Sequence, residues 1–435
     1  HLTNRRQRQM CIRDRYQSTG DYEKALTYFE QILQIWQHKG DKIGEGHTLY
    51  NIAVTYQTIG NFEKAIASTQ KSLQIRREIG DYAGEVYSLN NLGVIAFLLS
   101  DFDKAEGYFE QVAQMSKKIG NLESQCSALS NLSLIYSNKG AYQQAEKYSK
   151  AALKIYRHIE SKSGIASMLI NLGSNAMAQG DLAQAKNYTE QSIAICKEIG
   201  QKPYLSYAFN NMGSALYDLG DYKNSKRYFE LSHEIEQELG NKQGESDSFV
   251  NLAVIAQQMS ENEQALSYLK QAMDIKQQLK DKLGIATVYF SFGDLFLFLK
   301  KYKLAISYFN KNIAILKELN FQHKVLETHF IIAYTYLLID EKEKALHYLY
   351  NYFEPKEALE KSEKLKFSFK THLRIYHVML ANNEVESQKI LHILYKRLQK
   401  QAQKISDADL KHSFLHKVAV NKEILDLYEG YLTKK

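Results

Sequence analysis

Asparagine recurs at one position in six successive stretches of this chain, each forty residues after the last. These six residues, called the asparagine ladder below, are Asn51, Asn91, Asn131, Asn171, Asn211 and Asn251. An amide side chain can donate to a peptide carbonyl and accept from a peptide N–H. Because asparagine is a mediocre helix former, six placements in register need a reason. We favour hydrogen bonding to an extended peptide. The alternative is that each asparagine bonds to a neighbouring helix and holds the stack together.

Small polar side chains share a face with the ladder. On a helix, that face includes the residues four before, three after and seven after each asparagine. Around Asn131 these are Ser127, Leu134 and Asn138, and Asn138 is a further candidate peptide contact. The face is nearly free of Lys and Arg, which argues against a basic clamp for an acidic C-terminus. If successive helices lie about 8–10 Å apart, one asparagine would meet roughly every third residue of a ligand extended at ~3.3 Å per residue.

The same face changes character toward the C-terminal end of the chain, where the asparagine column lapses at Ser291 and Ile331. Aromatic, acidic and apolar residues appear there instead: Tyr207, Asp218, Asp247, Asp294, Phe298, Tyr334 and Leu338. We therefore expect a partner with an extended middle, basic residues opposite the aspartates and an apolar anchor near the last repeats. In addition to the asparagine ladder, three of these residues are candidate peptide-binding residues: Tyr207, Asp218 and Asp247.

Patterns that carry catalysis are not found in the sequence. It contains no phosphate-binding glycine loop, no HExxH, no nucleophile elbow and no cysteine pair at metal spacing. Cys11, Cys126 and Cys196 are scattered, which argues against a disulfide framework and favours a reducing, cytoplasmic setting. No apolar run approaches the roughly 18–20 residues that span a bilayer. We expect no enzyme activity, cofactor, metal site or membrane span.

Charge is distributed unevenly along the chain. Residues 1–15 carry +4 and residues 356–435 carry +6 of the formal net charge of +7, so residues 16–355 are at −3. Basic residues lie on one predicted helix near the C-terminus: Lys389, Lys396, Arg397, Lys400 and Lys404. They could contact nucleic acid, but a solvated helix face is the better interpretation. Nucleic acid is therefore an unlikely partner for this chain.

The elements that position the ladder repeat every forty residues from about residue 16 to 350. One column holds alanine or serine from Ala25 to Ala345, and another holds Gly, Ala or Ser from Ala53 to Ala333. Such columns mark close crossings of two helices. Each repeat has two halves with helical apolar spacing, such as 84–100 and 101–120. Glycine usually ends a half, and Asp or Asn often starts the next, so the sequence predicts consecutive helix pairs.

One string makes the repeat specific. Asn-Leu-Gly at 91–93, followed by Phe102, Ala105 and Phe109, resembles the tetratricopeptide repeat. The unit here is 40 residues instead of the usual 34, and the usual proline of the second helix is absent. In this it is similar to the Pins and kinesin light chain arrays and to arrays of bacterial signalling proteins. The resemblance implies an all-α fold, a right-handed superhelical solenoid of antiparallel helix pairs. It also implies that first helices line the concave surface and present asparagines to peptides.

The resemblance covers only part of the chain. We expect a non-repeat N-terminal remnant at 1–15, a truncated repeat at 16–40, eight repeats at 41–355 and a helical C-terminal cap at 356–435. The match stops abruptly before Tyr16, which favours a truncated or chimeric sequence over a natural cap. Residues 404–428 resemble a segment that closes such arrays in bacterial regulatory proteins, where the array is often fused to a cyclase, kinase or transcription-factor module.

Together these features predict a protein-protein interaction scaffold that binds an extended peptide segment of a partner in its concave groove, in bacterial regulation. The alternative is the sensory or regulatory portion of a larger signalling enzyme or transcription regulator. In that case the chemistry would lie outside these residues.

Overall fold

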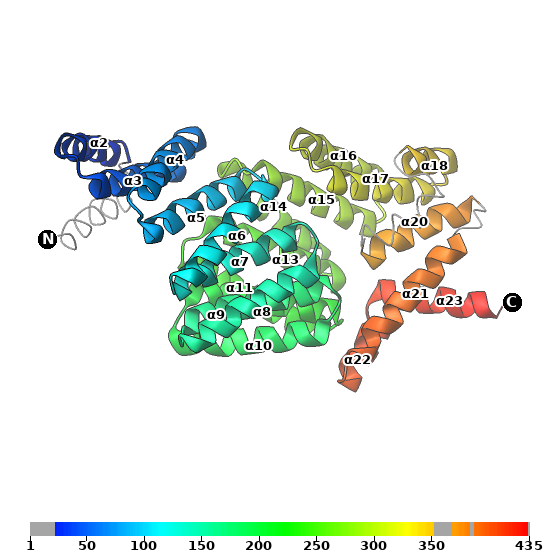
Figure 1. The fold of residues 1–435 in the computed structure, drawn as a ribbon. Helices are drawn as coiled ribbons and strands as arrows, with labels where there is room; N and C mark the ends of the chain where they lie inside the picture. The colour runs from blue at the N-terminus through cyan, green and yellow to red at the C-terminus, as the bar shows by residue number, and fades with distance from the viewer. Residues whose placement is uncertain (1–21, 352–367, 383–386, 434–435) are drawn as a thin grey trace. The chain divides into compact units, whose positions relative to one another are not determined.

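The computed structural model describes residues 22–351, 368–382 and 387–433, and every regular element in them is an α-helix. The expected remnant at 1–15 and the start of the truncated repeat lie outside the described residues. The chain divides into two compact units, residues 1–175 and 176–435, called the N-terminal and C-terminal units below. Consecutive helices pack against one another within each unit, which confirms the predicted all-α solenoid of antiparallel helix pairs (Figure 1).

The helices alternate along the repeats. First helices, which carry the ladder, are α3 (Lys42–Ile59), α5 (Tyr82–Leu98), α7 (Leu122–Asn138), α9 (Lys162–Ala178), α11 (Lys202–Asp218), α13 (Lys242–Gln258), α15 (Lys282–Phe298) and α17 (Gln322–Leu337). Second helices are α2 (Tyr22–Lys39), α4 (Phe62–Glu78), α6 (Phe102–Lys118), α8 (Tyr142–His158), α10 (Leu182–Ile199), α12 (Tyr222–Glu238), α14 (Asn262–Gln278), α16 (Tyr302–Glu318) and α18 (Lys342–Tyr350). The C-terminal helices are α20 (Phe369–Ala381), α21 (Ser387–Gln403), α22 (Ala408–His416) and α23 (Ala419–Leu432).

Local sequence explains where the helices begin and end. Helix α3 ends at Gly60, which has φ +83°, and its N–H bonds to the carbonyl of Gln57 at 3.0 Å. This left-handed backbone conformation ends the right-handed helix, and glycine adopts it without strain. The next helix starts at once, because the Asn61 side chain accepts from the N–H of Lys64 at 3.2 Å. The same turn recurs between later helices, so the 40-residue period is built from local signals.

The columns of small residues in the repeat lie where two helices are in close contact. Ala145 of α8 is fully buried. A Cβ atom added to Gly93 of α5 would lie 2.8 Å from the ring of Phe109 on α6, and Gly293 has the same relation to Phe309. The second-helix phenylalanine therefore packs directly on the first-helix backbone, which is why a larger side chain is excluded there.

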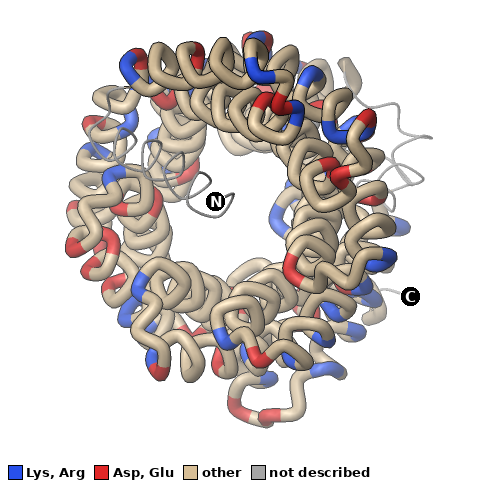
Figure 2. Tube along the Cα trace, turned by 60° about the vertical axis from the view of Figure 1, so that its left-hand side comes forward, with Lys and Arg blue, Asp and Glu red and all other residues tan. Residues whose placement is uncertain are grey.

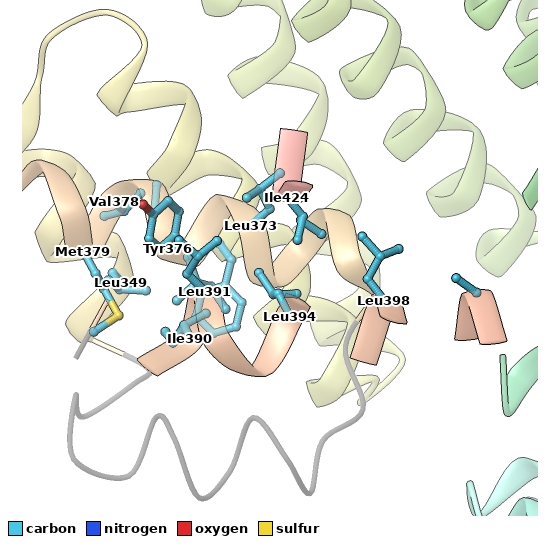
Figure 3. Packing of buried hydrophobic residues seen from close by; sticks show 14 of the residues in the cluster. Leu349, Leu373, Tyr376, Val378, Met379, Ile390, Leu391, Leu394, Leu398 and Ile424 are labelled. Atoms are coloured by element: carbon cyan, nitrogen blue, oxygen red, sulfur yellow. The ribbon is translucent and has the colours of Figure 1, made fainter. Parts of the chain in front are cut away.

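The four C-terminal helices continue the hydrophobic core beyond the last repeat. Helix α20 packs on α17 and α18, α21 packs on α20, and α23 packs on α21. Their buried side chains meet in one cluster that includes Leu349, Leu373, Tyr376, Leu391 and Ile424 (Figure 3).

These helices also reach back along the repeats. Lys404 Nζ lies 2.9 Å from Asp181 Oδ2, and Ser413 Oγ donates to the Gly220 carbonyl at 3.2 Å. The segment thus does more than cover the last repeat, because it also contacts the turns before α10 and α12.

Candidate functional site

The structure places the asparagine ladder on the first helices α3 to α13. Asn51 and Asn91 are buried, and the other four are half-buried. The ladder residues thus differ in their access to a ligand, although the sequence repeats the same residue type.

The hydrogen bonds of four ladder residues bear on the two hypotheses. Asn91 Nδ2 donates to Thr69 Oγ1 on α4 at 3.0 Å, and Asn251 Nδ2 donates to Asn210 Oδ1 on α11 at 2.9 Å. Both bonds join neighbouring helices, as the stacking alternative requires. Asn131 and Asn171 make no side-chain hydrogen bond to the described part of the chain, and each is partly open to solvent. The amides of these two asparagines are therefore available to a peptide.

The residue 22 positions before an asparagine, on the preceding second helix, explains this difference for Asn91 and Asn131. That position on the preceding second helix is Thr69 for Asn91 but Phe109 for Asn131. Threonine offers Asn91 an acceptor, whereas the phenylalanine ring offers none to Asn131. The same position does not account for Asn171, where it holds Ser149, or for Asn251, where it holds Phe229 and the bond goes to Asn210. Sequence reasoning that considered the ladder column alone missed the Thr69 partner of Asn91.

The remaining candidate residues have different surroundings. Asn138 is exposed, and its Nδ2 donates to the Leu134 carbonyl of its own helix at 2.8 Å. Tyr207 is 54% exposed. Asp247 Oδ1 accepts from the buried Lys276 Nζ at 2.6 Å. Since Asp247 already has this cation, it offers less to a basic ligand than the sequence suggested.

Asp294 is paired with the chain's own C-terminal segment. Its Oδ2 lies 2.8 Å from Lys370 Nζ, and its Oδ1 lies 2.9 Å from Arg374 on α20. Burial would raise the pKa of the Asp294 carboxyl, but the Lys370 and Arg374 charges outweigh it and hold this pKa well below its ordinary value. The basic residues expected opposite the aspartates are here supplied by α20.

A pocket lies within the C-terminal unit where the first helices end and the C-terminal helices cover them. Its volume is about 770 Å³. Its repeat side includes Asp218, Phe298 and Leu338, each at the position seven residues after a ladder column. The opposite side comes from α20 to α23: Phe369, Lys370, Leu373, Arg374, His377, Arg397, Gln401, Phe414 and Glu423. We call this cavity the C-terminal pocket.

Asp218 is the candidate residue with the most perturbed environment. Its side chain is open to the pocket, yet protein atoms surround it on several sides, and this burial raises the pKa of the carboxyl to about 6. Tyr217 and Tyr222 flank the site with ring centroids 5.6 Å apart, and burial raises the pKa of both phenols. The tyrosines therefore stay neutral beside the carboxylate.

The basic helix face expected near the C-terminus is partly used inside the chain. The Arg397 guanidinium lies 5.1 Å from the centroid of the Phe369 ring, and Lys404 pairs with Asp181. Along the repeats, Lys and Arg alternate with Asp and Glu without gathering by sign (Figure 2). Among the described residues, three ion pairs join the repeats to the C-terminal helices, and in each the acid comes from the repeats and the cation from the C-terminal helices. The opposite net charges of 16–355 and 356–435 agree with this, and sequence reasoning did not use them.

Within the part of the chain that the structure describes, no three His, Cys, Asp or Glu side chains gather in a way that could hold a metal ion. No described helix is both long and apolar enough to cross a membrane.

Comparisons with known proteins agree on the repeat. The family model described as tetratricopeptide repeat matches six stretches, of which the last five overlap: 16–78, 82–158, 124–198, 164–238, 204–278 and 244–318. A comparison with curated proteins finds no match.

Solved structures with a similar fold include two regulators. The apo form of the quorum sensor NprR from B. thuringiensis is 15% identical, over 80% of this chain and 97% of that one, with a TM-score of 0.59. The Rap conjugation gene regulator of the plasmid pLS20, in complex with the Phr* peptide, is 14% identical, over 78% of this chain and 96% of that one, with a TM-score of 0.56. At these identities, the likeness concerns the fold.

Proposed function

The chain belongs to the tetratricopeptide repeat family, and we propose that it is a protein-interaction scaffold that binds an extended peptide segment of a partner along its first helices. The setting we propose is regulatory, bacterial and cytoplasmic. The similar fold of a regulator solved with its Phr* peptide supports this proposal. The role requires binding groups only, and we propose no catalytic step.

The observation that carries the proposal is the pair Asn131 and Asn171. They stand one repeat apart on α7 and α9, half-buried and without a side-chain partner among the described residues. A half-buried amide that lacks a partner is costly unless a ligand or water satisfies it. An extended peptide backbone satisfies both the donor and the acceptor of such an amide.

The test starts with selection of binders to the full chain from a library of random peptides about twelve residues long, which would span roughly 40 Å when extended. Fluorescence anisotropy then measures the affinity of the selected peptides. We expect the double variant Asn131→Ala/Asn171→Ala to bind at least about tenfold more weakly, since each lost amide removes about 1 kcal/mol or more.

The matched control is Asn187→Ala/Asn310→Ala, which removes two exposed asparagines from the second helices α10 and α16. This control should bind as the unchanged chain does. Unchanged affinity of the Asn131/Asn171 double variant, with helix content intact by circular dichroism, would contradict the proposal. A library that yields no binder would do the same.

A further inference from the structure

We infer that the C-terminal pocket receives the cationic end of a basic side chain of the bound peptide, with Asp218 as its counter-ion. This inference rests on the proposed function, because it names the chemistry that the peptide would carry at one position. All of the residues that line the pocket belong to the C-terminal unit.

The first step is the pairing of the other charged groups that line the pocket. Asp294 holds Lys370 and Arg374, and His377 Nε2 lies 2.7 Å from Glu423 Oε1. Asp218 makes no ion pair or side-chain hydrogen bond within the described residues. Two more cations line the cavity: Arg397, which lies over the Phe369 ring, and Lys300. Burial raises the pKa of Asp218 with no cation among the described residues to offset it, so this carboxylate faces the cavity without a counter-ion from those residues.

The second step is the wall around this carboxylate. The rings of Tyr217 and Tyr222 lie beside it, and Phe298, which is 45% exposed, lines the same cavity. Aromatic faces attract ammonium and guanidinium groups and also pack against their aliphatic stems. A carboxylate among aromatic rings therefore suits a lysine or arginine side chain better than an anion or a neutral polar group.

The third step is the position of Asp218 relative to the ladder. It follows Asn211 by seven residues on α11, which places it two turns along the same helix face and about 10 Å away. A lysine or arginine side chain spans much of this distance. A peptide whose backbone lies on the first helices of the C-terminal unit can therefore place a basic side chain in the pocket.

Size and charge state are consistent with this occupant. About 770 Å³ is within the range of small-ligand sites. With a pKa of about 6, the Asp218 carboxyl is mostly ionised at neutral pH, and a bound cation would hold it in that form.

The experiment has one arm that needs no peptide. Phenethylamine, 2-phenylethanol and phenylacetate have similar size and differ in charge, and calorimetry measures their binding to the full chain at neutral pH. We expect phenethylamine to bind in the millimolar range and more tightly than the other two. Asp218→Asn should weaken phenethylamine about tenfold. The control Asp274→Asn, which neutralises an exposed aspartate on α14, should leave it unchanged.

The second arm repeats the peptide selection with the unchanged chain and with Asp218→Asn. Lysine or arginine should be enriched at one position with the former and lose that enrichment with the latter. The inference is overturned if phenylacetate binds best, if the three probes bind alike or not at all, or if Asp218→Asn leaves phenethylamine affinity unchanged. Selected peptides without a basic position would overturn the inference and leave the peptide scaffold standing. Amine binding without any selected peptide would contradict the peptide scaffold, and with it the peptide as occupant, and would leave only a cation site at Asp218.

Discussion

The helix face that carries the asparagine ladder ends differently in the two compact units. In the N-terminal unit, the positions seven residues after the asparagines are Thr58, Leu98 and Asn138, and all three are exposed. In the C-terminal unit, the corresponding Asp218, Phe298 and Leu338 line the C-terminal pocket. The repeat supplies the same helix face in both, so the difference comes from the non-repeat helices α20 to α23. A segment outside the repeat makes a cavity from a face that is otherwise open.

Exposed ion pairs occur in both units, and one pair from each unit gives a contrast in burial. Lys139 of the N-terminal unit pairs with Asp103, whose side chain is 94% exposed. In the C-terminal unit, Arg374 is 8% exposed and pairs with Asp294, which is 19% exposed. Exposed pairs contribute little to stability, whereas removal of one partner from a buried pair leaves an uncompensated charge.

The first prediction concerns Asp294. Asp294→Ala removes the acceptor of both Lys370 and Arg374, and we expect it to lower the free energy of unfolding of the C-terminal unit by about 3 kcal/mol. Urea unfolding followed by hydrogen exchange of α20 measures the loss. The matched change in the N-terminal unit, Asp103→Ala, should cost less than about 1 kcal/mol. Equal losses in the two variants would show that α20 is not held by this pair.

The second prediction uses the buried alanine column. Ala145 and Ala305 are both fully buried, and a leucine at either position should overpack its helix pair and cost about 1–3 kcal/mol. Each repeat contacts mainly its neighbours in a solenoid, so Ala145→Leu should reduce hydrogen-exchange protection in the N-terminal unit and Ala305→Leu in the C-terminal unit. Loss of protection that spreads equally through both units would contradict this separation.

The third prediction divides the ladder. Asn91→Ala removes a hydrogen bond to the buried Thr69 and should cost about 1 kcal/mol. Asn131→Ala removes no hydrogen bond to the described residues and should stay within about 0.5 kcal/mol. Thermal unfolding of both variants measures the difference. If Asn131→Ala proves the more damaging, then Asn131 has a structural role and is a poor candidate for peptide contact.

The repeats could be predicted from sequence because their signals are local. Gly60, Asn61 and the small residue at Gly93 act on neighbours in the same helix pair, and the 40-residue period multiplies each signal. Helix type and the position of the ladder on first helices followed from this periodicity. Which asparagines bond to a neighbouring helix could not be predicted from one column. Asn171 has the hydroxyl of Ser149 in the column of Thr69 and makes no such bond within the described residues, whereas Asn251 has Phe229 there and bonds to Asn210 instead.

The C-terminal pocket could not be predicted in the same way. Arg374 reaches Asp294 over 80 residues and Lys404 reaches Asp181 over 223, so no local pattern specifies these pairs. The acidic and aromatic residues at the C-terminal end of the ladder face were recognised from sequence. That α20 supplies the cations for Asp294, and leaves Asp218 without one, depends on how the C-terminal helices pack.

The smallest predicted effect concerns the pH dependence of the C-terminal unit. The pKa of Asp218 is about 6 in the folded chain against an ordinary 3.8, so the folded state binds more protons than the unfolded state between these values. Stability should therefore fall as pH rises through this window and remain lower above it. Because the carboxylate is open to solvent, we expect less than about 1 kcal/mol.

Asp218→Asn should remove this dependence, and the comparison of urea unfolding at acid and neutral pH measures it. The other charged and titratable groups that line the pocket, Lys300, Lys370, Arg374, Arg397, Asp294, His377, Glu423 and the neighbouring tyrosines, are unchanged by this substitution. Any difference between the pH profiles of the unchanged chain and of Asp218→Asn is therefore caused by the Asp218 carboxyl. Phenethylamine affinity should move the opposite way, rising as Asp218 ionises. The prediction fails if the two stability profiles coincide and the amine affinity does not change across pH 6. The Asp218 carboxyl would then be fully solvated, as the exposed positions Thr58, Leu98 and Asn138 are in the N-terminal unit.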